Sequence, residues 1–193
     1  MGSEKQDFYN FTVQGGLETD NSLSITGNAD FSDCTGITFS SSDNKITAGT
    51  TGESHSFKSN ENAKFKAVEL KGTSDLSGTL VLDTLSAEKI ASSETIRFNS
   101  AASSISYSDS DSVLNNIEIA SSAILSLQND ITVSGDWTNN NTSGNGLSAS
   151  GKTVTFTGEN ATISGDSTFA NAIFMGSATF GGSNAFTDFL LNC

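Results

Sequence analysis

The sequence contains no proline, although an average chain carries about 5%. Proline removes a backbone donor from a β-ladder, so its absence is typical of a chain made almost entirely of strands and tight turns. Basic residues are also scarce: nine Lys and Arg stand against 22 Asp and Glu, and the formal net charge is −13. Phosphate binding needs a basic face, so neither nucleic acid nor an anionic membrane surface is expected as a partner.

Histidine, cysteine and long apolar runs are scarce too. The single histidine, His55, lacks the partners that catalysis or metal binding needs. Cys34 and Cys193 have no metal-ligand spacing, and a bridge between them would join distant parts of an elongated molecule. No apolar run approaches the ~18 residues that cross a bilayer, and the N-terminus lacks the pattern of a signal peptide. The sequence therefore predicts no metal, no cofactor and no membrane insertion in this segment.

What the sequence does contain is a long series of short apolar–x–apolar triplets, separated by turns rich in Gly, Asn, Ser and Asp. Ile96-Arg97-Phe98 and Val154-Thr155-Phe156 are two of them. Alternation with a period of two, carried by β-branched and aromatic residues, is typical of strands. The middle residues are mostly Ser or Thr, as expected for a solvated sheet face.

A longer period of about 58 residues is also present, because Phe39, Phe98 and Phe156 recur at intervals of 59 and 58 residues. The approximate repeats are 8–64, 65–112, 113–168 and a partial copy at 169–193. Each repeat consists of two similar halves, and a half is too short to bury its own core, so it must pack against its neighbours.

These observations predict that residues 1–193 form one all-β domain, a parallel β-helix (β-solenoid). We expect it to be right-handed, with six to seven coils and little or no α-helix. Phe39, Phe98 and Phe156 are expected to form one inward ladder. A second, polar ladder at a turn is expected from Asn10, Asn116 and Asn171, because Asn side chains can bond to stacked neighbours.

Three segments interrupt the strand pattern. Ser86–Ala91 is the best helix candidate but is short, and we interpret it as a loop. Ser106–Ser112 and Asn139–Ser150 are expected to protrude as loops because they are rich in turn residues. The chain also ends inside an apolar triplet, which favours a piece of a longer rod.

Several residues could carry chemistry. Glu69, Arg97 and Glu118 occupy outward positions, and a row of the three on one face is conceivable. A cross-strand ion-pair ladder is the preferred interpretation, because a glycosidase needs clustered carboxylates in a cleft. Asp109 and Asp111 could bind Ca²⁺, but without EF-hand spacing a solvated acidic turn is preferred.

Trp137 could stack on a sugar or pack against the coils, and packing is preferred. Thr153, Thr155 and Thr157 alternate as in ice-binding solenoids, but Glu or Arg is expected at the matching positions of neighbouring coils. Four N-x-S/T sequons occur, a number that chance predicts in a chain this rich in Ser and Thr: they begin at Asn10, Asn140, Asn141 and Asn160.

The run TVTFTGENATISGDSTFANAIF, residues 153–174, resembles the β-strand repeats of large bacterial surface proteins, namely filamentous-haemagglutinin-like adhesins and autotransporter passenger domains. The resemblance extends over nearly the whole chain and is clearest in residues 113–191. It implies an exported right-handed parallel β-helix that acts as a stalk or adhesive surface. It carries over no binding residues.

The sequence thus favours a structural and adhesive shaft segment of an exported bacterial surface protein, without catalytic activity, located outside the cell or on its surface. Expected partners are host glycans or proteins, or other copies joined end to end. A carbohydrate-active enzyme or carbohydrate-binding module on a β-helix is the alternative, and an ice-binding solenoid is the third possibility. No catalytic, cofactor-binding or metal-binding residue is assigned.

Overall fold

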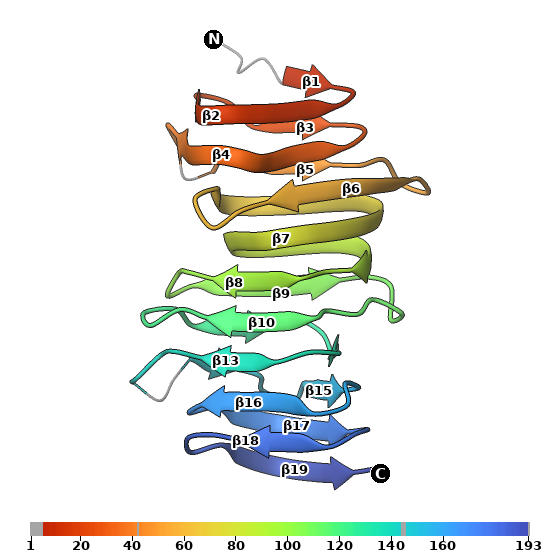
Figure 1. The fold of residues 1–193 in the computed structure, drawn as a ribbon, viewed down its shortest axis with the longest axis vertical. Coiled ribbons are helices and arrows are strands. Elements are labelled where there is room, and N and C mark those ends of the chain that lie inside the picture. The colour runs from red at the N-terminus through yellow and green to blue at the C-terminus, as the bar shows by residue number, and fades with distance from the viewer. Residues whose placement is uncertain (1–5, 42, 144–145, 193) are drawn as a thin grey trace.

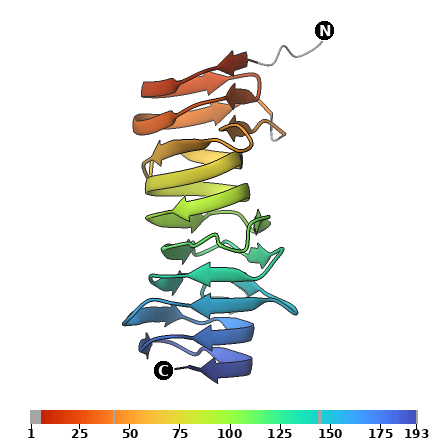
Figure 2. The ribbon, with the colours of Figure 1, turned by 90° about the vertical axis from the view of Figure 1, so that its right-hand side faces the viewer.

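The computed structural model describes residues 6–41, 43–143 and 146–192, and they form a rod of stacked coils with its two ends far apart (Figure 1). None of these residues lies in a helix, and every strand pairing is parallel and joins one coil to the next. The side view shows the same stack without an additional layer (Figure 2). The prediction of an all-β parallel solenoid is confirmed, whereas the right hand of the coil stays a prediction.

The strands fall into rows that run along the rod. The first row contains β1 (Gln6–Phe8), β3 (Leu23–Ile25) and β5 (Ile46–Ala48). The second contains β2 (Phe11–Thr19), β4 (Ala29–Phe39) and β6 (Ser54–Ser59). After β7, one row contains β8 (Thr95–Phe98), β10 (Asn116–Ile119), β13 (Trp137–Asn139), β16 (Ala161–Gly165) and β18 (Ala178–Phe180). Another row contains β9 (Ser103–Tyr107), β11 (Leu125–Leu127) and β14 (Leu147–Ser148). A separate four-stranded sheet, called sheet B here, contains β12 (Ile131–Val133), β15 (Thr153–Phe156), β17 (Thr168–Phe174) and β19 (Ala185–Leu191).

The long strand β7 (Lys64–Ser92) connects the rows. It pairs in succession with β5, β6, β8 and β9, so it turns from one face of the rod to the next as one continuous strand. Gly78 allows one of these bends: its φ is +75°, and an added Cβ would lie 2.0 Å from the Ser59 carbonyl oxygen of the coil before it. Only glycine combines that φ with so close an approach.

The core fills the interior of the coils along the whole rod. In β8, β10 and β15 the first and third positions are half-exposed and the second and fourth are buried. This is the alternation expected from the apolar–x–apolar triplets. The buried side chains form one continuous cluster from Val13 to Phe174.

The coils are shorter and more variable in length than the sequence period suggests. The coil that leads from Leu80 to its partner Ile96 is much shorter than the coil that leads from Ala29 to its partner Phe57. The solenoid therefore makes about nine turns, and the six to seven coils that we expected are not confirmed.

The variable coil length also explains why the predicted phenylalanine ladder is wrong. Phe98 pairs with Leu82 and Ile119, whereas Phe156 lies in sheet B between Val133 and Phe174. Both side chains are buried and Phe39 is partly buried against the same core. The repeat period of the sequence does not correspond to a whole number of coils, so like residues face the same interior from different sides.

The predicted loops are corrected as well. Ser86–Ala91 belongs to β7: Ser86 and Ala87 pair with β9, and Ala87 and Ile90 are buried. Ser106 lies within β9, and Asn139 ends β13. Asn141 is buried and donates from Nδ2 to the Ala123 carbonyl oxygen at 2.7 Å, so the start of the Asn139–Ser150 segment packs against the rod. Residues 144 and 145 of that segment lie outside the described residues.

Polar ladders join the coils at their corners, but their members differ from the predicted ones. Asn10 Oδ1 accepts from the Asn28 N–H at 2.8 Å, and Asn28 Oδ1 accepts from the Ser56 N–H at 2.8 Å. Elsewhere, Asn116 Oδ1 accepts from the Asp136 N–H at 2.9 Å. Asn10, Asn116 and Asn171 lie in different rows, so the single ladder proposed for them is wrong, although side-chain bonding between stacked coils is present.

The C-terminal end of the rod leaves inward-facing aromatic residues uncovered. Phe180 is 44% exposed and Phe189 is 49% exposed, although both face the core side of their strands. Phe189 contacts Phe174 with ring centroids 5.3 Å apart. The end of the core is therefore an apolar surface with an open strand edge on β19.

Candidate functional site

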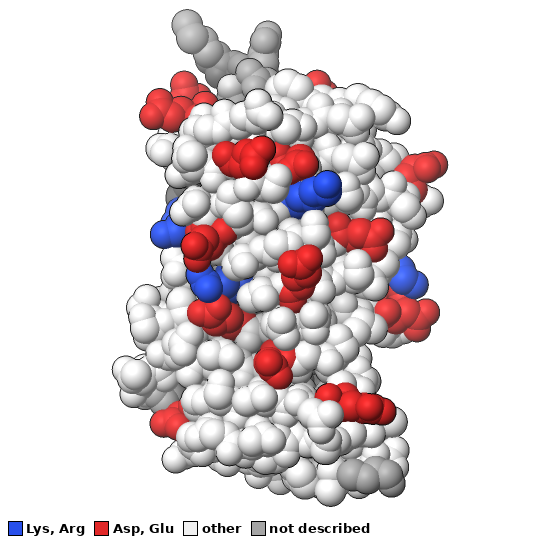
Figure 3. Space-filling view, viewed as in Figure 1, with Lys and Arg blue, Asp and Glu red and all other residues white. Residues whose placement is uncertain are grey.

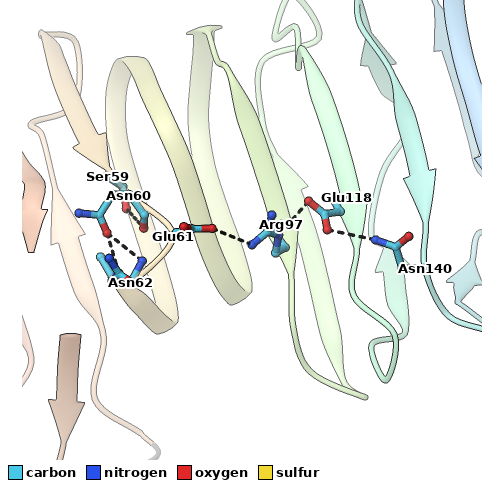
Figure 4. A network of polar contacts seen from close by, with 8 residues as sticks. Ser59, Asn60, Glu61, Asn62, Arg97, Glu118 and Asn140 are labelled. Carbon is cyan, nitrogen blue, oxygen red and sulfur yellow. Dashed lines mark hydrogen bonds and ion pairs between the residues drawn. The ribbon is translucent and has the colours of Figure 1, made fainter. Parts of the chain in front are cut away.

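A chain of charged and amide side chains crosses the outer face over β8 and β10 (Figure 4). Arg97 Nε donates to Glu118 Oε2 at 2.8 Å, and Arg97 Nη1 lies 3.9 Å from Glu61 Oε2. Asn140 Nδ2 donates to the other Glu118 oxygen at 3.1 Å. The predicted Arg97–Glu118 pair is therefore present, and each Glu118 oxygen already has a protein partner.

Glu69 is not part of that row. It lies on β7 opposite Thr47, where its carboxylate pairs with Lys45 and Lys71. Hydrogen bonds from the two ammonium groups lower the pKa of Glu69 to about 2. Glu61, in the turn before β7, occupies the place that we gave to Glu69, and sequence alternation could not identify it because it lies outside the triplets.

His55 lies in β6 with its side chain turned inward, not in a solvent-exposed turn, and is only 5% exposed. Its Nε2 lies 3.2 Å from Ser74 Oγ, and its Nδ1 is buried without a hydrogen-bond partner. Burial lowers the pKa of His55, and the nearby Asp75 raises it by a smaller amount. Since Ser74 is 0% exposed, this pair has no access for a substrate and belongs to the core.

Asp109 and Asp111 lie together beside Lys89. The Lys89 ammonium is 3.2 Å from Asp109 Oδ2 and 3.8 Å from Asp111 Oδ2. The Asp111 N–H and then Lys89 lower the pKa of Asp109. Among the described residues no group of three or more His, Cys, Asp or Glu side chains could hold a metal ion.

Trp137 packs in the core, as preferred from the sequence. It is 0% exposed, contacts Phe156 and Phe169, and donates from Nε1 to Ser167 Oγ at 3.1 Å. Of the sequon asparagines, Asn141 is buried, whereas the other three are exposed: Asn10, Asn140 and Asn160. Cys34 is buried and free, and Cys193 lies outside the described part of the chain.

The threonine array does not extend over neighbouring coils. Thr155 lies between Thr132 and Ile173, and Thr153 lies beside Asn171. The neighbours are thus threonine, isoleucine, asparagine and, beside Thr153, Asp130, rather than the Glu or Arg that we expected. The row still lacks the repeated threonines of a flat hydroxyl array.

A trough runs along the outer face of sheet B. Two adjoining hollows of about 590 and 270 Å³ share the lining residues Thr153 and Ile173, and together they extend across β12, β15, β17 and β19. The segment around Ser108 and Ser110, which follows β9, forms one wall.

Two rows of side chains form the floor of this trough. The strand register and the bond from the Thr153 N–H to Asp130 Oδ1 at 2.9 Å define a polar row. Its members are Asp130, Thr153, Asn171 and Asp188. The second row changes from hydroxyl to apolar along the rod, and its members are Thr132, Thr155, Ile173 and Leu190. The sequence did not reveal the trough, because its residues come from separate coils whose register depends on variable loop lengths.

No known protein family, curated protein or solved structure matches this chain. The described residues contain no helix that is both long and apolar enough to cross a membrane.

Proposed function

We propose that this chain is a structural and adhesive shaft segment of an exported bacterial surface protein. The observation that carries the proposal is the continuous core, which runs from Val13 to Phe174 through every coil and makes the chain a rod. A solenoid in which each coil contacts only its neighbours suits a shaft, since coils can be added at an end without changing the coils already present. The outward Ser and Thr positions supply a long hydroxyl-rich surface for host glycans or proteins.

Surface labelling tests this proposal directly. The natural full-length protein, tagged within the exposed turn between β5 and β6, should be accessible to antibody and protease on intact cells. Small-angle scattering of the purified chain should give an elongated particle. Retention of the protein inside the cell, with no labelling of intact cells, would contradict export.

A carbohydrate-active enzyme on the same fold is the alternative, and the carboxylate positions favour it less. Asp130 and Asp188 in the trough are three coil steps apart, or roughly 14 Å at ~4.8 Å per step. Glycosidase carboxylates lie about 5–9.5 Å apart. Release of reducing ends from neutral polysaccharides by the purified chain would nevertheless favour the enzyme.

Two further proposals follow from the ends and faces of the rod. End-to-end association of copies is supported by the exposed Phe180 and Phe189, and sedimentation at increasing concentration should show a growing mass. Ice binding is supported less, because Ile173 interrupts the threonine row. A thermal-hysteresis reading of zero is expected.

A further inference from the structure

We propose that the trough on sheet B binds an uncharged oligosaccharide that lies along the rod axis, across the strands. This inference rests on the proposed adhesive function and assigns it a place. The trough crosses four strands in register, so an extended ligand meets an equivalent position in each successive coil, about every 4.8 Å. A repeating ligand fits such a repeating floor.

The chemistry of the two rows suits a sugar chain. Carboxylate, hydroxyl and amide groups in the polar row offer both acceptors and donors for sugar hydroxyls. Beside them, Ile173 and Leu190 offer apolar contact for the C–H faces of the rings, and Leu190 is 54% exposed. A small number of fixed polar groups next to apolar surface is the usual composition of a small-molecule site.

The charges in the trough disfavour an anionic ligand. Asp130 and Asp188 both line it, and Lys152 is the only basic residue after Arg97 in the sequence. A phosphorylated or uronic-acid chain would place its charges beside two carboxylates with one ammonium to offset them. Like charges at short range weaken binding, so the favoured ligand is neutral.

The polar groups are held in place before a ligand arrives. Asp130 Oδ1 accepts from the Thr153 N–H, and the neighbouring Asn129 accepts from the Tyr107 N–H at 3.0 Å. With its amide turned so that Nδ2 donates, Asn171 lies 3.1 Å from Asp188 Oδ2. Fixed side chains lose little conformational freedom on binding, which favours affinity in an open site.

An extended peptide fits the trough less well than a glycan. A peptide that adds to a sheet bonds to an open strand edge and runs parallel to the strands. In sheet B the backbone groups of β15 and β17 are paired on both sides, and the trough crosses the strands. A peptide added at the outer edge of β19 would run parallel to that strand and would not follow the trough across β12, β15 and β17.

Calorimetry with neutral oligosaccharides of increasing length tests the inference on the whole chain. The probes are β-1,4-linked glucose, β-1,4-linked mannose and N-acetylglucosamine oligomers, with oligogalacturonate as the anionic comparison. At least one neutral series should bind, with affinity that rises with length and levels off once the chain spans the three coil steps. Failure of every neutral series to bind, or tighter binding of oligogalacturonate, would overturn the proposal.

Matched variants locate the binding. Thr155→Tyr fills the floor of the trough and should weaken binding at least about tenfold, the change equivalent to 1.4 kcal/mol. Thr162→Tyr makes the same change at an exposed strand position on β16 and should bind like the natural chain. Leu190→Gln, at an exposed site on the last strand, should weaken binding severalfold without affecting the core. Unchanged binding by both Thr155→Tyr and Leu190→Gln would overturn the placement.

The two proposals fail separately. Surface labelling of cells that produce the Thr155→Tyr variant should match that of the natural protein, because the trough is not needed for export. If the natural protein reaches the cell surface but binds no oligosaccharide, the trough proposal is wrong and the shaft proposal stands. If the natural protein binds the oligosaccharide but is absent from the cell surface, the shaft proposal is wrong and the trough proposal stands.

Discussion

The middle of the rod and its C-terminal coils hold neighbouring coils together by different means. In the middle, cross-coil ion pairs such as Arg97–Glu118 and Lys66–Asp83 lie on the outer faces. The ion pairs of these coils lie between Asp30 and Glu118. Figure 3 shows one face, where basic side chains lie only over the upper and central coils and the lower part carries acidic side chains without basic ones.

Aromatic side chains pack in the core of both regions. In the middle coils Phe31, Phe57 and Phe65 lie with ring centroids 5.1, 5.5 and 5.6 Å apart, and stacked pairs occur beyond Glu118. Phe156 and Phe174 are nearly parallel, with centroids 4.7 Å apart, and Phe169 stacks on Phe186 at 5.3 Å. Exposed ion pairs contribute about 0.2–1 kcal/mol each, whereas removal of a buried aromatic side chain costs about 3–5 kcal/mol. Both regions therefore have an aromatic core, and the middle coils have surface ion pairs in addition.

Replacement of Trp137 by alanine should have the largest effect on this comparison. The fully buried side chain contacts Phe156 and Phe169, so the free energy of unfolding should fall by about 3–5 kcal/mol. Because coils contact only their neighbours, hydrogen exchange should accelerate in β13, β15 and β16 and remain slow in β5 and β6. Equal acceleration along the whole rod would show that the two regions unfold as one unit.

Two glycine substitutions should then show what the regions share. An added Cβ at Gly165 would lie 1.8 Å from the Asn139 carbonyl oxygen, and at Gly78 it would lie 2.0 Å from that of Ser59. Both residues have positive φ, so alanine at either position should cost at least about 1–3 kcal/mol. Denaturant unfolding should show similar decreases in the free energy of unfolding for Gly165→Ala and Gly78→Ala.

Gly151→Ala is the control for those variants. Gly151 also has a positive φ, but nothing lies within 4 Å of its added Cβ. Its cost should reflect backbone strain alone and be the smallest of the three. A loss at Gly151 equal to that at Gly165 would mean that the close approach of coils adds nothing.

Acidification should weaken the middle region before the C-terminal coils. Burial lowers the pKa of His55 below its usual 6.5, so the unfolded chain takes up the proton first as the pH falls. Stability from the neutral His55 is complete above pH 6.5 and declines below it. The free energy of unfolding should therefore fall between pH 7 and 5, measured by urea unfolding.

His55→Phe should flatten that decline, since the substituted residue does not titrate. Glu69 responds in a lower window: its folded pKa of about 2 means that its contribution is complete above its unfolded value of 4.5 and is lost as the pH falls toward 2. An unchanged slope in His55→Phe between pH 7 and 5 would assign the decline to other groups.

Salt should produce the smallest difference. Raising NaCl to about 1 M screens exposed charges. The stability of the middle coils should therefore fall by a few tenths of a kcal/mol per ion pair, and that of the C-terminal coils should not change. Arg97→Met should remove most of this salt dependence near β8 and β10, as read by local hydrogen exchange. Lys152→Met serves as the comparison, because Lys152 has no ion pair among the described residues.

The strands could be predicted from local pattern because the alternation of apolar and polar residues within each triplet already indicates which side chains face inward. Ile96-Arg97-Phe98 reads as buried–exposed–buried, and the structure has that order. Register could not be predicted in the same way, because it depends on how many residues each corner takes. The Phe98 and Phe156 ladder was wrong for that reason, and the Glu61 contact to Arg97 was missed since Glu61 lies in a corner.

The candidate trough shows the same limit from the functional side. Asp130, Thr153, Asn171 and Asp188 do not stand out in the sequence, and the spacings between them differ. They form a row only because coils of unequal length bring them into register. A site composed of one residue per coil has no sequence motif.

Five of the side-chain bonds between coils point the same way along the rod. Asn10, Asn28, Asn116, Asp136 and Asp166 each use a side-chain oxygen to accept a backbone N–H from the following coil. A finished coil thus presents acceptors in place for residues that are synthesised after it. Because the N-terminal coils are synthesised first, these acceptors are in place when the next coil arrives. Asn129 and Ser112 work in the opposite sense, since each accepts a backbone N–H from an earlier coil.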